Sequence, residues 1–225
     1  MSATTAPAPW RAKVGRPVGS SIFRTIYRGR ALGTERVPAT GPVLLVANHA
    51  AFLDGPLVFS LAPRPVNFLV KQEAFSGPFG RLIQTVGQIP IDRGMGDRAA
   101  LGRAVAVLER GGAVGIFPEG NRQGGEVQNV NQGAAWIALR TGAPIVPVAV
   151  LGTRVAGADA DAWPMPRSVL TVDFGLPFHL VAPPGLPGRE RLRAATDQLR
   201  DTLADHVRRA RVDNGATAPT DSRKP

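Results

Sequence analysis

Residues 43–54 are the most informative part of the sequence and read Val43-Leu44-Leu45-Val46-Ala47-Asn48-His49-Ala50-Ala51-Phe52-Leu53-Asp54. Its first five residues are all apolar, which predicts a short buried strand, and the pattern over 52–61 favours a helix. Between them stand Asn48 and His49, with Asp54 a little further on. Because open α/β sheets form their sites at the carboxyl ends of strands, this junction predicts an α/β fold with a site at 48–54.

Polar clusters follow three other apolar runs in the same way. The run 66–70 leads to Lys71, the run 87–91 leads to Arg93, and the run 113–116 leads to Phe117-Pro118-Glu119-Gly120-Asn121-Arg122. An arginine at a strand end can hold a phosphate with two donors, and glycine lets a backbone approach a ligand closely. Each cluster alone is equally typical of an exposed loop, but together they predict a site for a phosphorylated hydroxyl compound.

The rest of the chain alternates strand and helix signals, which favours a single-domain mixed sheet flanked by helices. Predicted strands are 43–47, 66–70, 87–91, 113–117, 145–151 and 169–174, and predicted helices are 52–61, 97–110, 133–140 and 189–211. Pro147 predicts that its strand lies at an edge of the sheet. The folded domain is expected over 19–212, between a flexible Ala/Pro/Gly-rich arm at 1–18 and a disordered tail at 213–225.

Residues 19–30 predict one more helix, which is amphipathic. Its apolar positions are Ile22, Phe23, Ile26 and Tyr27, and its other face carries arginines. Such a helix either lies at a membrane interface or packs on the core.

The composition limits the kinds of chemistry. The 225 residues are 44% apolar, which is enough for a core, and the absence of cysteine excludes disulfides, thiol nucleophiles and thiolate metal sites. The three histidines are far apart in sequence, so we expect no metal site. The formal charge of +10 predicts anionic partners, but 6% aromatic content and no recognisable nucleic-acid motif argue against nucleic acid. No secretory signal or run of ~20 apolar residues is visible, so we expect a protein that does not cross a membrane but could lie on one.

His49 and Asp54 suggest proton transfer. Five positions on an ideal helix correspond to roughly 500° of rotation, so the two side chains meet only if His49 precedes the helix and Asp54 begins it. A carboxylate on one imidazole nitrogen fixes the tautomer and leaves the other nitrogen as a general base. No serine or cysteine stands nearby, so the base would act on a hydroxyl of the substrate. The alternative is a turn histidine that is merely capped by a helix-start aspartate.

These motifs together resemble the glycerophospholipid acyltransferases, the family of the 1-acylglycerol-3-phosphate O-acyltransferases. The resemblance covers roughly residues 40–150, and the first and third motifs are its strongest part. In order along the chain the motifs are Asn48-His49 with Asp54, then Lys71-Gln72-Glu73 leading to Ile91-Asp92-Arg93, then 117–122, then Ala143-Pro144-Ile145-Val146-Pro147-Val148.

The resemblance implies an acyltransferase-type α/β sandwich that moves a fatty acyl group from acyl-CoA or acyl carrier protein to a lysophospholipid hydroxyl, without a cofactor. The acceptor it favours is 1-acylglycerol-3-phosphate, which would give phosphatidic acid. By analogy His49 is the base and Asp54 its orienting partner. Positions associated with the acceptor phosphate in the family match Lys71, Arg93, Glu119, Gly120 and Arg122.

Two alternatives stay open at the level of sequence. One is an acyltransferase with a different lipid acceptor, and the other is a non-catalytic basic module that binds anionic membrane. In every case we expect a cytoplasmic protein that is peripheral on the inner face of the cell membrane.

Overall fold

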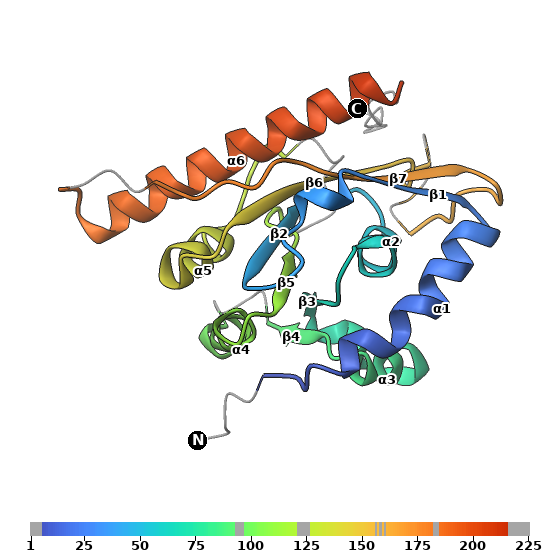
Figure 1. Cartoon of the computed structure of the whole chain (residues 1–225), viewed down its shortest axis with the longest axis horizontal. Coiled ribbons are helices and arrows are strands. Elements are labelled where there is room, and N and C mark those ends of the chain that lie inside the picture. Colours follow the sequence, from blue (N-terminus) through green and yellow to red (C-terminus); the bar gives the residue numbers. More distant parts are fainter. Residues whose placement is uncertain are drawn as a thin grey trace.

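A computed structural model describes residues 6–92, 97–120, 127–155, 157, 159, 161–181 and 185–215. These residues form one mixed sheet in the order β1-β7-β6-β2-β5-β3-β4, with helices on both faces (Figure 1). All neighbouring strands are parallel except β6 and β7. The strands are β1 Arg28–Leu32, β2 Val43–Ala47, β3 Val66–Lys71, β4 Ile89–Ile91, β5 Ala113–Ile116, β6 Ile145–Leu151 and β7 Val169–Phe174. The predicted α/β class and the mixed sheet are thereby confirmed.

Six α-helices and two 3-10 turns are found in the described part of the chain. The α-helices are α1 Arg11–Thr25, α2 Asp54–Leu61, α3 Gly77–Thr85, α4 Arg98–Glu109, α5 Gly133–Thr141 and α6 Gly188–Asp213, and the 3-10 turns are Thr34–Arg36 and Gln72–Phe75. Asp97 caps α4 by accepting the backbone N–H of Ala100, as predicted. No helix among these described residues is both long and apolar enough to span a lipid bilayer.

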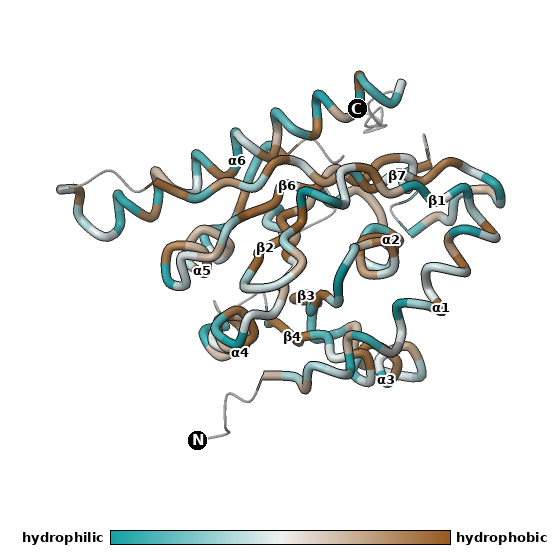
Figure 2. The backbone as a smooth tube through the Cα atoms, viewed as in Figure 1, coloured by the Kyte–Doolittle hydropathy of each residue, from teal (hydrophilic) through white to brown (hydrophobic). Residues whose placement is uncertain are grey.

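Alternating residues of β2 divide the core into two layers. Leu44 and Val46 pack with α4, α5 and α6 on one face of the sheet, whereas Val43 and Leu45 pack with α2 on the other. All five residues of β2 are buried because the strand lies near the middle of the sheet. In Figure 2 the long α6 alternates hydrophilic and hydrophobic residues along its length, as expected of a helix with one face on the core.

The amino-terminal segment differs from the prediction. Helix α1 begins at Arg11, inside the predicted flexible arm, and ends at Thr25, after which 28–32 pair with β7. Phe23 and Tyr27 are buried in the core, while Ile22 and Ile26 on the opposite side remain exposed. The predicted helix at 19–30 is therefore wrong in its bounds. Phe23 and Tyr27 pack on the core, as one of the two alternatives expected, and a membrane contact through the exposed Ile22 and Ile26 stays a prediction.

Two further predictions need correction. Strand β6 lies between β2 and β7 and is not an edge strand. Pro147 is tolerated there because it lies one residue beyond the last β6–β7 pair, Val148 with Phe174, so its missing N–H removes no bond from that ladder. Helix α3 was not predicted at all. At the carboxyl end, α6 runs to Asp213, and the predicted tail from 216 onward lies outside the described residues.

Candidate active site

The turn between β2 and α2 brings His49 and Asp54 together. The Nδ1 of His49 lies 2.8 Å from Oδ2 of Asp54, which is the first residue of α2 and fully buried. The same oxygen accepts the backbone N–H groups of Ala50 at 2.7 Å and Ala51 at 2.8 Å. The chain thus wraps around the carboxylate. His49 precedes the helix and Asp54 begins it, which is the arrangement that the sequence requires for the two side chains to meet.

A residue that the sequence did not indicate completes this arrangement. The hydroxyl of Thr153, just beyond β6, donates to Oδ1 of Asp54 at 2.5 Å. Asp54 therefore accepts hydrogen bonds on both oxygens and cannot rotate without losing them. With a carboxylate on Nδ1, the neutral imidazole carries its proton there and presents the lone pair of Nε2, which is the form that a general base requires.

Three neighbouring strand ends hold the imidazole in place. The ring of Phe117, just after β5, stacks on His49 with centroids 4.3 Å apart, and Oε1 of Glu119 accepts the His49 backbone N–H at 2.8 Å. Asn48 exchanges two hydrogen bonds with the backbone of Val150, at 2.7 and 3.2 Å, so its side chain continues the pairing between β2 and β6. The backbone of His49 and one face of its ring are therefore fixed.

Glu119 is an unusual carboxyl group. It is 5% exposed, and its Oε2 has no hydrogen-bond partner within the described part of the chain. Burial, together with the nearby charge of Asp54, raises the pKa of Glu119 to about 8, while the hydrogen bond from the His49 backbone and the charge of Arg211 act in the opposite direction. At neutral pH this side chain is therefore largely protonated and can offer an O–H group on Oε2.

Of the four other predicted site residues, the structure describes Gly120 and Lys71 but not Arg93 and Arg122. Gly120 has a φ of +71°, and a Cβ there would overlap the side chain of Asn131, so glycine is required by the loop itself. Lys71 ends β3 and is exposed, two strands away from β2 in the sheet. Arg93 and Arg122 lie outside the described residues, so their predicted contact with phosphate stays a prediction.

Exposed apolar side chains border the site. Phe52, inside the turn between His49 and Asp54, has its ring centroid 5.4 Å from that of Phe79 on α3 and 6.3 Å from that of Trp163 in the segment after β6. Phe79 is 40% and Trp163 64% exposed. Together with the exposed neighbours Leu82 and Met165, these residues form what we term the aromatic rim.

Comparison with known proteins identifies the class. The family model named Acyltransferase matches residues 30–151, more than half of the chain. The chain belongs to this acyltransferase family, as its motifs predicted, and it is an O-acyltransferase.

The alignments with individual relatives cover between 54% and 76% of the chain. It is 27% identical over 173 residues to the 1-acyl-sn-glycerol-3-phosphate acyltransferase of Bacillus subtilis, covering 76% of this chain and 84% of that protein. It is 34% identical over 127 residues to the enzyme of the same name from Borreliella burgdorferi, covering 54% of this chain and 50% of that one. The lyso-ornithine lipid O-acyltransferase of Pseudomonas aeruginosa is 38% identical over 124 residues, with 54% and 47% covered. The chain thus spans about half the length of the latter two relatives.

The fold is shared with a solved structure. The crystal structure of the 1-acyl-sn-glycerophosphate (LPA) acyltransferase PlsC from Thermotoga maritima matches with a TM-score of 0.67 at 23% sequence identity, over 92% of this chain and 80% of that one. The predicted acyltransferase-type architecture is therefore confirmed.

Proposed function

We propose that this enzyme transfers a fatty acyl group from a thioester donor, acyl-CoA or acyl carrier protein, to the hydroxyl of a lysophospholipid. The observation that carries the proposal is the buried His49–Asp54 pair, 2.8 Å apart, at the carboxyl end of β2. The preferred acceptor in this proposal is 1-acylglycerol-3-phosphate, which gives phosphatidic acid. The names of the Bacillus and Borreliella relatives support that choice. The name of the Pseudomonas relative favours lyso-ornithine lipid as a second candidate acceptor.

The mechanism follows from the tautomer of His49. Nε2 removes the proton of the acceptor hydroxyl while its oxygen attacks the carbonyl carbon of the thioester. Asp54, bonded to Nδ1–H, keeps the ring oriented and stabilises the imidazolium that forms. The tetrahedral intermediate then expels the thiolate, which takes the proton from Nε2, so the products are the ester and the free thiol. The attacking oxygen comes from the substrate, and no covalent acyl-enzyme is required.

We assign supporting roles to the remaining site residues. Lys71, Arg93 and Arg122 form the proposed binding group for the acceptor phosphate, since all three follow strands whose carboxyl ends lie on the site's edge of the sheet. Glu119 and Gly120 belong to the same motif, but their contacts suggest a different task. Glu119 holds the backbone of His49, and Gly120, which has no Cβ, leaves room for the side chain of Asn131.

The aromatic rim favours a peripheral position on the inner face of the cell membrane. Phe79, Leu82, Trp163 and Met165 expose apolar surface beside the site, and the exposed Arg81 and Arg167 neighbour them in the chain. Apolar and amphipathic rings flanked by cations are suited to an anionic lipid surface. A binding module without catalysis would need the rim and the charge, but it would not need a buried His49–Asp54 pair.

The direct test is the His49→Ala variant. Removal of the base should lower the rate of thiol release from long-chain acyl-CoA, with 1-acylglycerol-3-phosphate as acceptor, by about 10²–10⁴. Wild-type enzyme with a panel of lysolipids and with acyl carrier protein as donor defines both substrates. Circular dichroism confirms that the variant is folded. A folded His49→Ala protein with wild-type turnover would refute the mechanism.

A further inference from the structure

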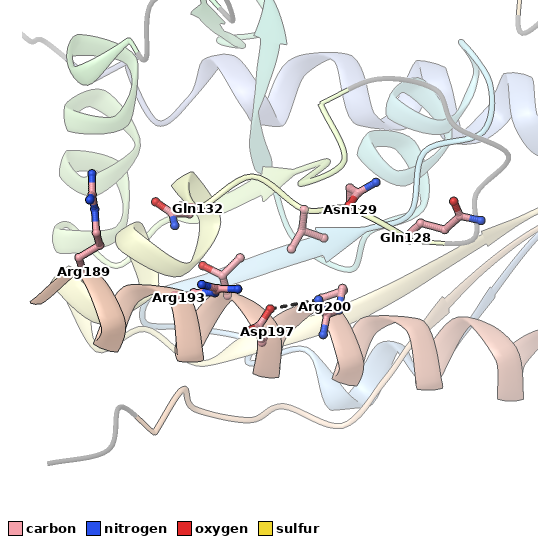
Figure 3. A pocket seen from close by; sticks show the side chains of 9 residues that line it. Gln128, Asn129, Gln132, Arg189, Arg193, Asp197 and Arg200 are labelled. Atoms are coloured by element: carbon pink, nitrogen blue, oxygen red, sulfur yellow. Dashed lines mark hydrogen bonds and ion pairs between the residues drawn. The ribbon is translucent and has the colours of Figure 1, made fainter. Parts of the chain in front are cut away.

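A concave surface lies between α6 and the segment 127–132 that precedes α5 (Figure 3). It is a groove of about 520 Å³. Its lining is polar and basic, and includes Arg189, Arg193, Asp197 and Arg200 of α6 and Asn129 and Gln132 of the facing segment.

The cations of this groove are not equivalent. Arg200 is bonded to Asp197 at 3.0 Å and to Asp201 at 2.9 Å, so its charge is largely compensated. Arg189 and Arg193, one helical turn apart, form no ion pair in the part of the chain that the structure describes. The side chains of both are exposed, and Gln132 lies nearest to them across the groove, while Asn129 lines it further along (Figure 3). Two free guanidinium groups in a groove that also holds amide groups are suited to phosphate groups and to the polar edge of a base.

The groove and the catalytic site share one loop. The backbone N–H of Asn131, beside the groove residues 130 and 132, donates to the carbonyl of Pro118 at 2.7 Å. Pro118 stands between Phe117, which stacks on His49, and Glu119, which accepts its backbone N–H. The groove is thus tied to the catalytic site but is built from different residues.

This separation matches the chemistry of the donor. The reacting thioester is uncharged, whereas the phosphates of coenzyme A are joined to it through the pantetheine arm. An enzyme that places the thioester beside His49 must therefore receive those phosphates away from the imidazole. The groove supplies cations apart from the residues assigned to the acceptor phosphate, and the Asn131–Pro118 hydrogen bond joins its segment 127–132 to the loop that carries Phe117 and Glu119.

We propose that Arg189 and Arg193 bind the phosphate groups of the coenzyme A part of the acyl donor. The assignment rests on the proposed function for the identity of the ligand. A nucleotide is favoured over an acidic carrier protein because the free guanidinium groups lie in a concave groove that also holds amide side chains, and not on a broad flat face.

The experiment measures the binding of free coenzyme A to the full-length protein by calorimetry. The double variant Arg189→Gln/Arg193→Gln should bind coenzyme A at least about tenfold more weakly, since each arginine loses a charge-assisted hydrogen bond. The matched control is Arg208→Gln, which removes an exposed arginine of the same helix that is paired with Asp205 outside the groove. In turnover, the double variant should raise the KM for acyl-CoA and leave the KM for the lysolipid unchanged.

Three results would overturn the proposal: equal binding by the double variant and the wild type, equal affinity of the wild type for pantetheine and coenzyme A, or use of acyl carrier protein by an enzyme that does not bind coenzyme A. The His49→Ala variant separates this proposal from the proposed function, because it should lose turnover and keep coenzyme A affinity. If the groove variant loses coenzyme A while the wild type transfers no acyl group, the binding site stands and the proposed function fails.

Discussion

At the scale of single residues, the site is determined by how completely Asp54 is held. Two backbone N–H groups and His49 bond one of its oxygens, and the hydroxyl of Thr153 bonds the other. The sequence could predict the first part of this arrangement, since a histidine before a helix-start aspartate is a local pattern. It could not predict Thr153, because that contact joins positions 99 residues apart.

Thr153 is therefore a positioning residue that can be tested. Thr153→Val keeps the shape of the side chain and removes the donor to a buried carboxylate oxygen, which should lower the free energy of unfolding by about 1–3 kcal/mol. We also expect kcat to fall by about tenfold, since the imidazole is less firmly oriented. Thr153→Ser keeps the hydroxyl and should restore kcat and its pH profile. A Thr153→Val enzyme with an unchanged kcat and pH profile would show that the contact is structural only.

Glu119 makes stability depend on pH in a predictable direction. Its pKa is about 8 in the folded protein against 4.5 as the ordinary value, so between these pH values the folded chain holds a proton that the unfolded chain has lost. The free energy of unfolding should therefore fall as the pH rises from 4.5 through about 8. Glu119→Gln keeps an oxygen for the His49 N–H and cannot titrate.

The measurement compares the two proteins by urea unfolding at about pH 5 and about pH 8.5. The free energy of unfolding of the variant minus that of the wild type should rise by about 2–4 kcal/mol from the lower to the higher pH, given 1.36 kcal/mol for each pKa unit. Taking the difference cancels other titrating groups, such as the half-buried Asp173. A constant difference across this range would contradict the raised pKa of Glu119.

At the scale of elements, the largest errors of sequence reasoning have one cause. Helices α1 and α3 contain Gly15, Pro17, Gly19, Gly77, Pro78 and Gly80, a composition typical of loops. In the structure several of these glycines permit close packing: a Cβ on Gly19 would overlap Ser60 of α2, and one on Gly80 would overlap the backbone of Phe75. Periodicity reveals helices with large buried side chains, but it does not reveal helices that approach their neighbours through glycine.

The same elements give two candidate membrane surfaces. The aromatic rim lies beside the site, and the exposed Ile22 and Ile26 lie at the carboxyl end of α1, Ile22 in its last turn and Ile26 as its C-cap. We predict that Leu82→Ser/Trp163→Ser weakens flotation with anionic vesicles by at least about tenfold, because each exposed apolar side chain that enters the lipid contributes about 1.5–3 kcal/mol. Ile22→Ser/Ile26→Ser should have the smaller effect.

Val212→Ser supplies the control, since Val212 is 81% exposed on α6 and belongs to neither surface. All of these variants change exposed side chains and should remain folded. If the α1 variant loses vesicle binding and the rim variant keeps it, the membrane contact lies on α1, as the amphipathic pattern of 19–30 first suggested.

At the scale of the whole molecule, the order of strands in the sheet explains why the sequence predicts the fold class but not which strands pair with each other. Apolar runs mark the middle strands β2, β5 and β6 clearly, because both of their faces are buried. Strand β1 alternates between exposed and half-buried residues at the edge of the sheet, and its arginine-rich sequence predicts part of a helix instead. Its partner β7 lies more than 130 residues away, and no local pattern encodes that pairing.

The core and the site are joined by a column of rings. Phe68 of β3 stacks on Phe117 with centroids 5.5 Å apart, and Phe117 stacks on His49 at 4.3 Å. Gly115 of β5 lies against Phe68, and a Cβ there would overlap the Phe68 ring. We therefore expect the position of the His49 imidazole to depend on the absence of a methyl group at Gly115, deep inside the sheet.

We predict that Gly115→Ala lowers both stability and activity. The added methyl must displace the Phe68 ring in a close-packed core, which should reduce the free energy of unfolding by about 1–3 kcal/mol. Because the displacement passes through Phe117 to His49, kcat should fall while the KM for acyl-CoA stays near that of the wild type.

Phe68→Leu provides the matched test, since a smaller side chain at 68 leaves room for the methyl. The double variant should be more stable than the sum of the two single effects predicts, a coupling that chemical denaturation measures directly. Strict additivity, or a Gly115→Ala enzyme that keeps its wild-type kcat, would mean that the ring column does not position His49.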